Sequence, residues 1–187
     1  MSDNCMNALS SGLDYTLKNH ILIVKKQRSN DMNIVLTRID NRLLHGIVMT
    51  QWAGTTGAQR VMVIDDKTAN SPILKQTMML AKPAGMAASI ITYDTALANM
   101  KAGKYEGQKI FLLTKSPVTI LKLVKEGIKI PNLQIGATES LEGFKCSRRA
   151  FLSEEELNAC KELLNLGVHI TVQHVPTDTK VEFSTLI

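Results

Sequence analysis

From residue 33 onward, short apolar runs alternate with segments that carry helix-start signals, and this alternation limits the folds available to the chain. The runs are rich in valine and isoleucine, as buried strands are. Near-continuous apolar strands that alternate with helices are typical of a mostly parallel sheet covered on both faces. Strands are predicted at residues 33–37, 60–65, 87–92, 109–114, 133–136 and 168–174.

The helix-start signals are specific. Ser71-Pro72 and Ser116-Pro117 each place a capping serine before a proline at the first helical position. Residues 153–156 read Ser-Glu-Glu-Glu, a capping box for a helix that runs to about Leu166 and stops at Gly167. We therefore predict an α/β fold, an open and mostly parallel sheet with helices on both faces. Residues 142–151 are compatible with a hairpin that adds an antiparallel edge.

The 187 residues predict one domain preceded by a distinct N-terminal segment. Residues 1–31 are rich in Ser, Asn and Lys and show little periodicity, so we expect a poorly ordered extension there and a single α/β domain over 32–187. No apolar run approaches the roughly 20 residues of a membrane-spanning helix. Cys5, Cys146 and Cys160 are odd in number and widely spaced, which argues against a disulfide framework or a zinc site and fits a reducing cytoplasm.

The formal net charge of +5 raises the question of nucleic-acid binding. The basic residues are scattered, however, and form no arginine-rich stripe with interleaved aromatics, so we expect no nucleic-acid partner. A mildly basic surface also suits an acidic or phosphorylated protein, or a membrane-bound complex.

The residues with the strongest chemical signal follow the first predicted strand, where residues 38–46 read Arg-Ile-Asp-Asn-Arg-Leu-Leu-His-Gly. In an open parallel sheet this position is the carboxyl end of a strand, where ligands bind. His45 is a competent nucleophile at neutral pH, and Arg42 is a donor suited to phosphoryl oxygens. Gly46 permits close backbone approach, and it opens a helix whose first N–H groups, including that of Ile47, favour an anion. The pattern predicts phosphoryl transfer to His45.

Two neighbours of His45 have less certain roles. Asp40 could accept a hydrogen bond from the imidazole nitrogen that does not attack, or brace Arg38 and Arg42, or act as an ordinary turn residue. Arg38 sits just beyond the predicted strand, so we give it a supporting role at most.

Other polar pairs follow later strands. Asp65-Asp66 could bind Mg²⁺ or cap a turn, and we favour the turn, with Asp66 lining a pocket. Lys115-Ser116 ends the fourth strand at a helix start and could also line a pocket, although a plain helix cap explains it. His169 and His174 have no metal or catalytic spacing and are expected to be structural. Glycine-rich nucleotide loops and metal motifs are absent from the sequence, so we predict neither cofactor nor metal.

The run at 38–46 resembles the IIB component of the mannose/fructose/sorbose family of the bacterial sugar phosphotransferase system. The resemblance extends from Met32 to about Pro176. Its further landmarks are Gln51-Trp52, Asp65-Asp66, Lys115-Ser116-Pro117 and the run at 172–176.

The resemblance implies a protein-N(pi)-phosphohistidine–sugar phosphotransferase with an open α/β fold. His45 would accept a phosphoryl group from a phosphohistidine of the IIA component, with Arg42 and Asp40 in support. The group would pass to a sugar of the mannose, fructose, sorbose or N-acetylgalactosamine class carried by the membrane IIC/IID complex. The chain would then be cytoplasmic and peripherally associated with the membrane through its partners, with homo-oligomerisation left open. The rival interpretation is a non-catalytic regulatory module that keeps the fold and binds a phosphorylated partner.

Overall fold

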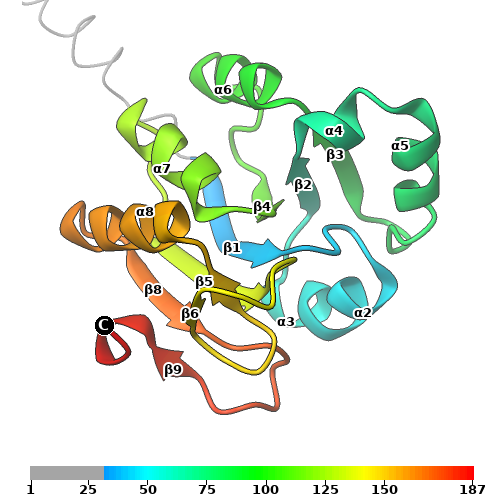
Figure 1. The fold of residues 1–187 in the computed structure, drawn as a ribbon. Coiled ribbons are helices and arrows are strands. Elements are labelled where there is room, and N and C mark those ends of the chain that lie inside the picture. The colour runs from blue at the N-terminus through cyan, green and yellow to red at the C-terminus, as the bar shows by residue number, and fades with distance from the viewer. Residues whose placement is uncertain (1–31) are drawn as a thin grey trace, which may run out of the picture. The chain divides into compact units, whose positions relative to one another are not determined.

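The computed structural model describes residues 32–187, and the extension expected at residues 1–31 lies outside the described residues. Seven strands form one sheet in the order β3-β2-β4-β1-β5-β8-β9 (Figure 1). All neighbouring pairs are parallel except the edge pair β8 and β9. The strands are β1 Asn33–Asp40, β2 Arg60–Ile64, β3 Ala87–Ile91, β4 Lys109–Thr114, β5 Asn132–Ala137, β8 His169–Val172 and β9 Val181–Glu182.

Helices cover both faces of this sheet, as the alternation of elements predicts. The helical elements are α2 Gly46–Val48, the π-helix η1 Met49–Ala53, α3 Gly54–Thr56, α4 Asp66–Ala69, α5 Pro72–Met79, α6 Tyr93–Lys101, α7 Pro117–Lys125, α8 Glu154–Asn165 and the 3₁₀-helix η2 Phe183–Thr185. The α2, η1 and α3 elements follow one another without a gap, and we call them together the 46–56 helix.

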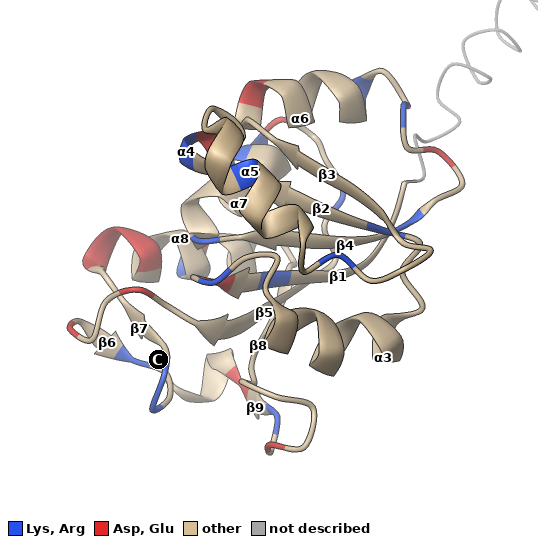
Figure 2. Cartoon of the chain, turned by 90° about the vertical axis from the view of Figure 1, so that its right-hand side faces the viewer, with Lys and Arg blue, Asp and Glu red and all other residues tan. Residues whose placement is uncertain are grey.

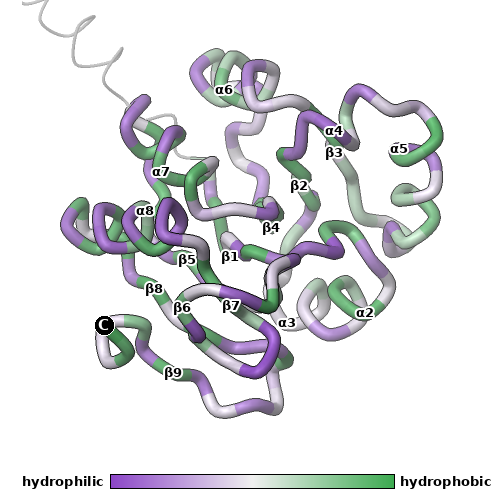
Figure 3. The backbone as a smooth tube through the Cα atoms, in the orientation of Figure 1, coloured by the Kyte–Doolittle hydropathy of each residue, from purple (hydrophilic) through white to green (hydrophobic). Residues whose placement is uncertain are grey.

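Two apolar clusters lie on opposite faces of the sheet, because successive strand side chains point to opposite sides. In β4, Ile110 and Leu112 belong to the cluster that holds the apolar residues of α6, α7 and α8. Phe111 and Leu113 belong to the second cluster, which packs under the 46–56 helix. The tube in Figure 3 shows the corresponding hydrophobic stretches along the central strands. Both faces of the central strands are therefore buried, as a parallel sheet requires.

The predicted helix starts are confirmed in detail. The Ser71 and Ser116 side chains cap α5 and α7, each before a proline in the first turn. Ser153 and Glu156 form the reciprocal capping box of α8, and Gly167 follows that helix with a left-handed φ of 84°.

Three details differ from the sequence-based prediction. The first strand continues to Asp40, so Arg38 and Asp40 belong to the strand and not to the loop after it. The last parallel strand ends at Val172, so His174 lies in a loop. The 142–151 hairpin forms from β6 Phe144–Lys145 and β7 Phe151–Leu152, but as a separate sheet, and β9 supplies the antiparallel edge instead.

None of the helices within residues 32–187 is long and apolar enough to cross a membrane.

Residues 32–187 build a sheet with both faces covered, which is what an independently stable α/β unit needs. We therefore predict that deleting residues 1–31 leaves the melting temperature within about 2 °C of the full-length value, since about 1 kcal/mol shifts it by ~2–4 °C at this size. Thermal unfolding of both proteins, followed by circular dichroism, measures this. A much lower melting temperature for the shortened chain would show that the domain boundary is wrong.

Candidate active site

The loop between β1 and α2 is anchored by two leucines and exposes the residues that follow them. Leu43 and Leu44 are buried in the cluster under the 46–56 helix, whereas His45, Gly46 and Ile47 are exposed. Leu43 has a positive φ of 54°, which a non-glycine residue adopts at some energetic cost. Burial of its side chain holds this conformation, and the chain turns so that the imidazole of His45 faces solvent.

His45 is the N-cap residue of the 46–56 helix. Its Nδ1 accepts a hydrogen bond from the backbone N–H of Ile47 at 3.2 Å. Because Nδ1 is the acceptor, a neutral ring carries its proton on Nε2, and the lone pair of Nδ1 points at the start of the helix. An ideal Cβ at Gly46 would meet no atom within 4 Å, so the space beside this glycine is open. The sequence predicts a close backbone approach at Gly46, but no other part of the described protein lies close to this glycine.

Arg38 lies inside β1 and is fully buried, contrary to the expectation that it sits beyond the strand. Its guanidinium is 4.7 Å from the centre of the Trp52 ring. Every one of its donor groups has a partner. Nε and Nη2 donate to Asp40 Oδ2 at 3.2 and 2.9 Å, Nη1 donates to Gln134 Oε1 at 2.6 Å and to the Gln173 carbonyl at 2.9 Å, and Nη2 also donates to the His174 carbonyl at 2.8 Å.

Asp40 connects this buried arginine to the exposed loop. Arg42 donates from Nε to Asp40 Oδ1 at 2.8 Å and from Nη2 to Oδ2 at 2.9 Å, a two-point grip that fixes its guanidinium. The backbone N–H of Arg42 also donates to Oδ1 at 3.2 Å. Of the roles open to Asp40, the structure shows the brace for Arg38 and Arg42. Its hydrogen bonds to described side chains all go to these two arginines, and none reaches His45.

The charges of this triad stabilise one another. Burial alone would raise the pKa of Asp40, but the hydrogen bonds and charges of Arg42 and Arg38 outweigh it and hold this pKa below its usual value. Burial lowers the pKa of Arg38 against the opposing effect of Asp40, and the hydrogen bond to Asp40 raises the pKa of Arg42. Asp40 is therefore ionised at neutral pH and presents Arg42 as a fixed cation at the surface.

Sequence reasoning missed three residues of this network. Gln134 in β5 accepts from Arg38 and donates from Nε2 to Gln173 Oε1 at 3.1 Å. Gln173 in turn donates to the carbonyls of Pro176 and Asp178. A Cβ at Gly136 would lie 2.0 Å from Arg38 Nη2, so only glycine leaves room for the guanidinium. A polar residue within an apolar strand is the signal that could have pointed to Gln134.

One cavity adjoins the loop, and a second shares two lining residues with it. The first, of about 370 Å³, is lined by His45 and Arg42 together with Lys67 and Lys115. The second, of about 250 Å³, is lined by Asp66, Lys115 and Ser116. The two lysines line both cavities, so Lys115, which the sequence predicts to line a pocket, and Lys67, which it does not single out, both lie near His45.

Both members of the acidic pair at the second cavity accept hydrogen bonds from backbone N–H groups. Asp65 caps α4 by accepting from the N–H of Thr68 at 2.9 Å, and Asp66 accepts from the N–H of Tyr93 at 2.7 Å. The cap interpretation therefore holds for Asp65, whereas Asp66 connects the start of α4 to the start of α6. Within residues 32–187, no group of three or more His, Cys, Asp and Glu side chains gathers in a metal-binding arrangement.

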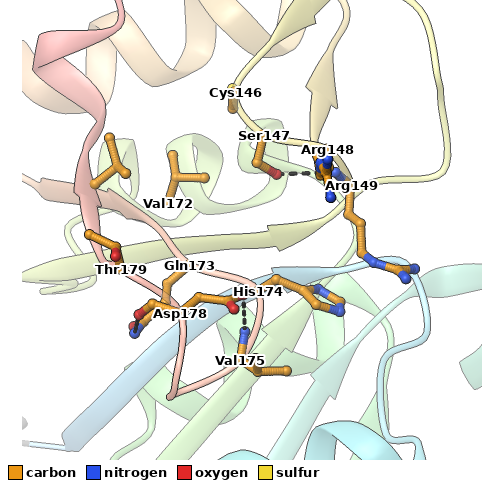
Figure 4. A pocket seen from close by; sticks show the side chains of 11 residues that line it. Cys146, Ser147, Arg148, Arg149, Val172, Gln173, His174, Val175, Asp178 and Thr179 are labelled. Atoms are coloured by element: carbon orange, nitrogen blue, oxygen red, sulfur yellow. Dashed lines mark hydrogen bonds between the residues drawn. The ribbon is translucent and has the colours of Figure 1, made fainter.

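A third cavity, of about 400 Å³, lies on the other side of β1, between the β6–β7 hairpin and the chain that follows β8. Figure 4 shows His174 and Arg149 on the same side of it, with Asp178 farther away. Burial lowers the pKa of His174, and the charges of Arg42 and Arg149 lower it further. Cys146 also lines this cavity, and burial raises the pKa of its thiol to about 12, as it does for Cys160. A raised pKa keeps both groups in the thiol form at neutral pH, which is the less nucleophilic form.

The buried triad generates a prediction about stability. Arg38→Met removes the cation that pairs with the buried Asp40 and the donor of Gln134 and two carbonyls, so we expect a loss of about 3–5 kcal/mol in the free energy of unfolding. Chemical denaturation measures this. Arg148→Met is the matched control, since Arg148 is exposed, and it should change stability by less than about 0.5 kcal/mol. Similar values for the two variants would mean that the network contributes nothing to the fold.

Comparison with known proteins identifies the family of this chain. Residues 34–187 match the family model of the "PTS system sorbose subfamily IIB component". The N-acetylgalactosamine-specific phosphotransferase enzyme IIB component 1 of Escherichia coli K12 is 35% identical over 150 residues, which is 79% of this chain and 94% of the relative.

Solved structures of IIB components also superpose on this chain. The IIBSor domain of the sorbose permease from Klebsiella pneumoniae superposes with a TM-score of 0.77 at 30% identity, over 83% of this chain and 96% of that domain. The N-acetylgalactosamine-specific IIB component 1 from Escherichia coli superposes with a TM-score of 0.74 at 34% identity, over 81% of this chain and 99% of the other. The chain belongs to the sorbose subfamily of IIB components of the sugar phosphotransferase system.

Proposed function

We propose that His45 is the residue of this IIB component that carries the phosphoryl group. The donor is a phosphohistidine of the IIA component, and the acceptor is a sugar held by the membrane IIC/IID complex. The observation that carries this proposal is the position of His45, which is exposed at the N-terminus of a helix with Arg42 held next to it by Asp40. We infer that the chain works in the cytoplasm, where both partners present their reactive groups.

The geometry favours Nδ1 as the nucleophile. In the first step its lone pair forms a bond to phosphorus while the bond from phosphorus to the donor imidazole breaks, and the donor nitrogen keeps the electron pair. The incoming phosphoryl group takes the position at Nδ1 where the Ile47 N–H donates at 3.2 Å. The N–H of Ile47 then donates to a phosphoryl oxygen instead. The start of the helix and Arg42 then stabilise the negative charge.

The second step returns the site to its first state. A sugar hydroxyl oxygen attacks phosphorus, the Nδ1–phosphorus bond breaks, and the electron pair returns to the His45 ring while the hydroxyl proton passes to solvent. Lys115 and Lys67, which line the same cavity as His45, contribute positive charge to both steps. The predicted pocket residues Asp66 and Ser116 line the neighbouring cavity and not the cavity of His45. We propose a sugar of the mannose, fructose, sorbose or N-acetylgalactosamine class as acceptor.

A non-catalytic module that only binds a phosphorylated partner is the second candidate. It requires the same cationic surroundings but no exposed nucleophile. The exposed imidazole with its lone pair directed at a helix N-terminus favours transfer over simple binding.

Incubation with the phosphorylated IIA component of the same system should give a modification that is labile in acid and stable in base, at His45. Mass spectrometry of peptides prepared at alkaline pH locates it. His45→Gln should abolish the label, whereas His169→Gln should retain it, because His169 is paired with Glu182 away from this loop. Label on His169, His174 or Cys146 would contradict the assignment.

The guanidinium of Arg42 should matter for its shape as well as its charge. A fork can grip two phosphoryl oxygens, whereas an ammonium is a point charge on a flexible stem. Arg42→Lys should fold normally and slow phosphoryl transfer to His45 by about 10²–10³-fold, the effect typical of losing one preorganised donor. Rapid-quench kinetics measures the rate, with the exposed Arg148→Lys as control. A rate close to that of the wild type would leave the helix N-terminus as the sole source of stabilisation.

A further inference from the structure

The α5 helix is unusual because it has no buried residue over Pro72–Met79. Ile73 is 75% exposed, and Leu80, at the end of the helix, is 87% exposed. A surface helix normally turns its apolar stripe toward the core, so apolar side chains this exposed need another explanation. Residues 73, 77 and 80 follow one another at helical spacing and share one side. We call Ile73, Leu74, Thr77 and Leu80 the α5 face.

The α5 face is continuous with the candidate active site. Leu74 and Thr77 line the cavity that also contains His45 and Arg42. Ile47, two residues beyond the imidazole, is a further exposed apolar side chain. Within residues 32–187, five of the eight large apolar side chains that are strongly exposed are Ile47, Ile73, Leu74, Met79 and Leu80. The exposed apolar surface is therefore concentrated beside the nucleophile.

The charged side chains that line the cavity of His45 or lie on α5 are all basic, whereas Asp65 and Asp66 line the neighbouring cavity. Neither residues 41–64 nor residues 68–93 contain an aspartate or a glutamate. Figure 2 shows the helix labelled α3 without any charged residue and α5 with a lysine, which is Lys75. Arg42, Lys67 and Lys115 line the cavity itself. The result is an apolar patch with a basic edge, the arrangement that fits a partner with an apolar centre and an acidic rim.

We propose that the α5 face is the docking surface for the protein that donates the phosphoryl group, an inference that rests on the proposed function of His45. In the first transfer step the donor must bring its phosphohistidine to Nδ1, and protein surface must therefore close over the cavity rim that α5 forms. The incoming phosphoryl group is anionic, so the basic edge attracts it. The sugar that arrives in the second step carries no charge and gains nothing from that edge, which favours the donor over the membrane complex as the occupant.

The test replaces the two most exposed residues of the face. In Ile73→Ser/Leu80→Ser, the KM for the phosphorylated IIA component and the Kd for its unphosphorylated form should each rise at least about tenfold, as for the loss of interface anchors. The kcat should change by less than about twofold, because neither side chain lines the cavity of His45. Phosphorylation of His45 by the small donor phosphoramidate, which needs no docking, should proceed at the wild-type rate.

Two control variants separate docking from general surface effects. Leu141→Ser removes an equally prominent apolar side chain, 76% exposed, from a different part of the surface and should leave KM and Kd unchanged. Lys75→Glu should raise KM, more at low than at high salt, whereas Lys145→Glu on β6 should not. A rise of the same size in either control would overturn the proposal.

The remaining outcomes are also decisive. Unchanged KM and Kd in the α5 variant would overturn the docking proposal while leaving His45 as the phosphoryl carrier. If the variant accepts the phosphoryl group normally but transfers it poorly to sugar on membrane vesicles that contain IIC/IID, the face belongs to the membrane complex. If phosphoramidate and the phosphorylated IIA component both fail to label His45 in the wild type, the proposed function is wrong, and the Kd comparison still decides whether IIA docks on α5.

Discussion

The buried guanidinium of Arg38 is the interaction on which the rest of this site depends. A charge inside a sheet is costly unless it is paired and every donor is satisfied. Here the donors reach Asp40 in β1, Gln134 in β5 and two carbonyls of the chain that follows β8. One side chain therefore holds together the carboxyl ends of three neighbouring strands. The absence of a side chain at Gly136 and the Trp52 ring over the guanidinium complete its enclosure.

Through this arrangement the buried charge of Arg38 fixes the position of a second charge, that of Arg42, at the surface. Asp40 is held by Arg38 from inside the sheet, and it holds Arg42 at the rim through two short hydrogen bonds. Arg42 consequently does not have to be ordered when a phosphoryl group arrives, which is the advantage of a preorganised site. The buried Leu43 and Leu44 do the same for the backbone of the loop, so that His45 is exposed without being loosely attached.

The sequence predicts the fold and the position of His45 at a helix start well, since both depend on local patterns. Serine caps, a proline in the first turn and the β-branched strands each act within a few residues. The partners of Arg38 could not be predicted, because Gln134 and Gln173 lie 96 and 135 residues farther along the chain and come together only through the strand order. The sequence places Arg38 beyond the first strand, because a charged residue indicates the end of a buried strand unless its partners are known. The structure shows it inside β1.

The position of His45 also constrains how the two transfer steps follow each other. In the proposed mechanism a single nitrogen, Nδ1, faces the donor in the first step and the sugar in the second, and His45 lines one cavity together with Arg42. If the donor and the membrane complex both cover this cavity, they bind one after the other, and the IIA component leaves before the sugar is reached. An interface of moderate affinity is then an advantage, because slow dissociation of a tight donor complex would limit turnover. A small apolar helix face with a basic edge is suited to such an interface, in which charge speeds association and the limited apolar area permits release.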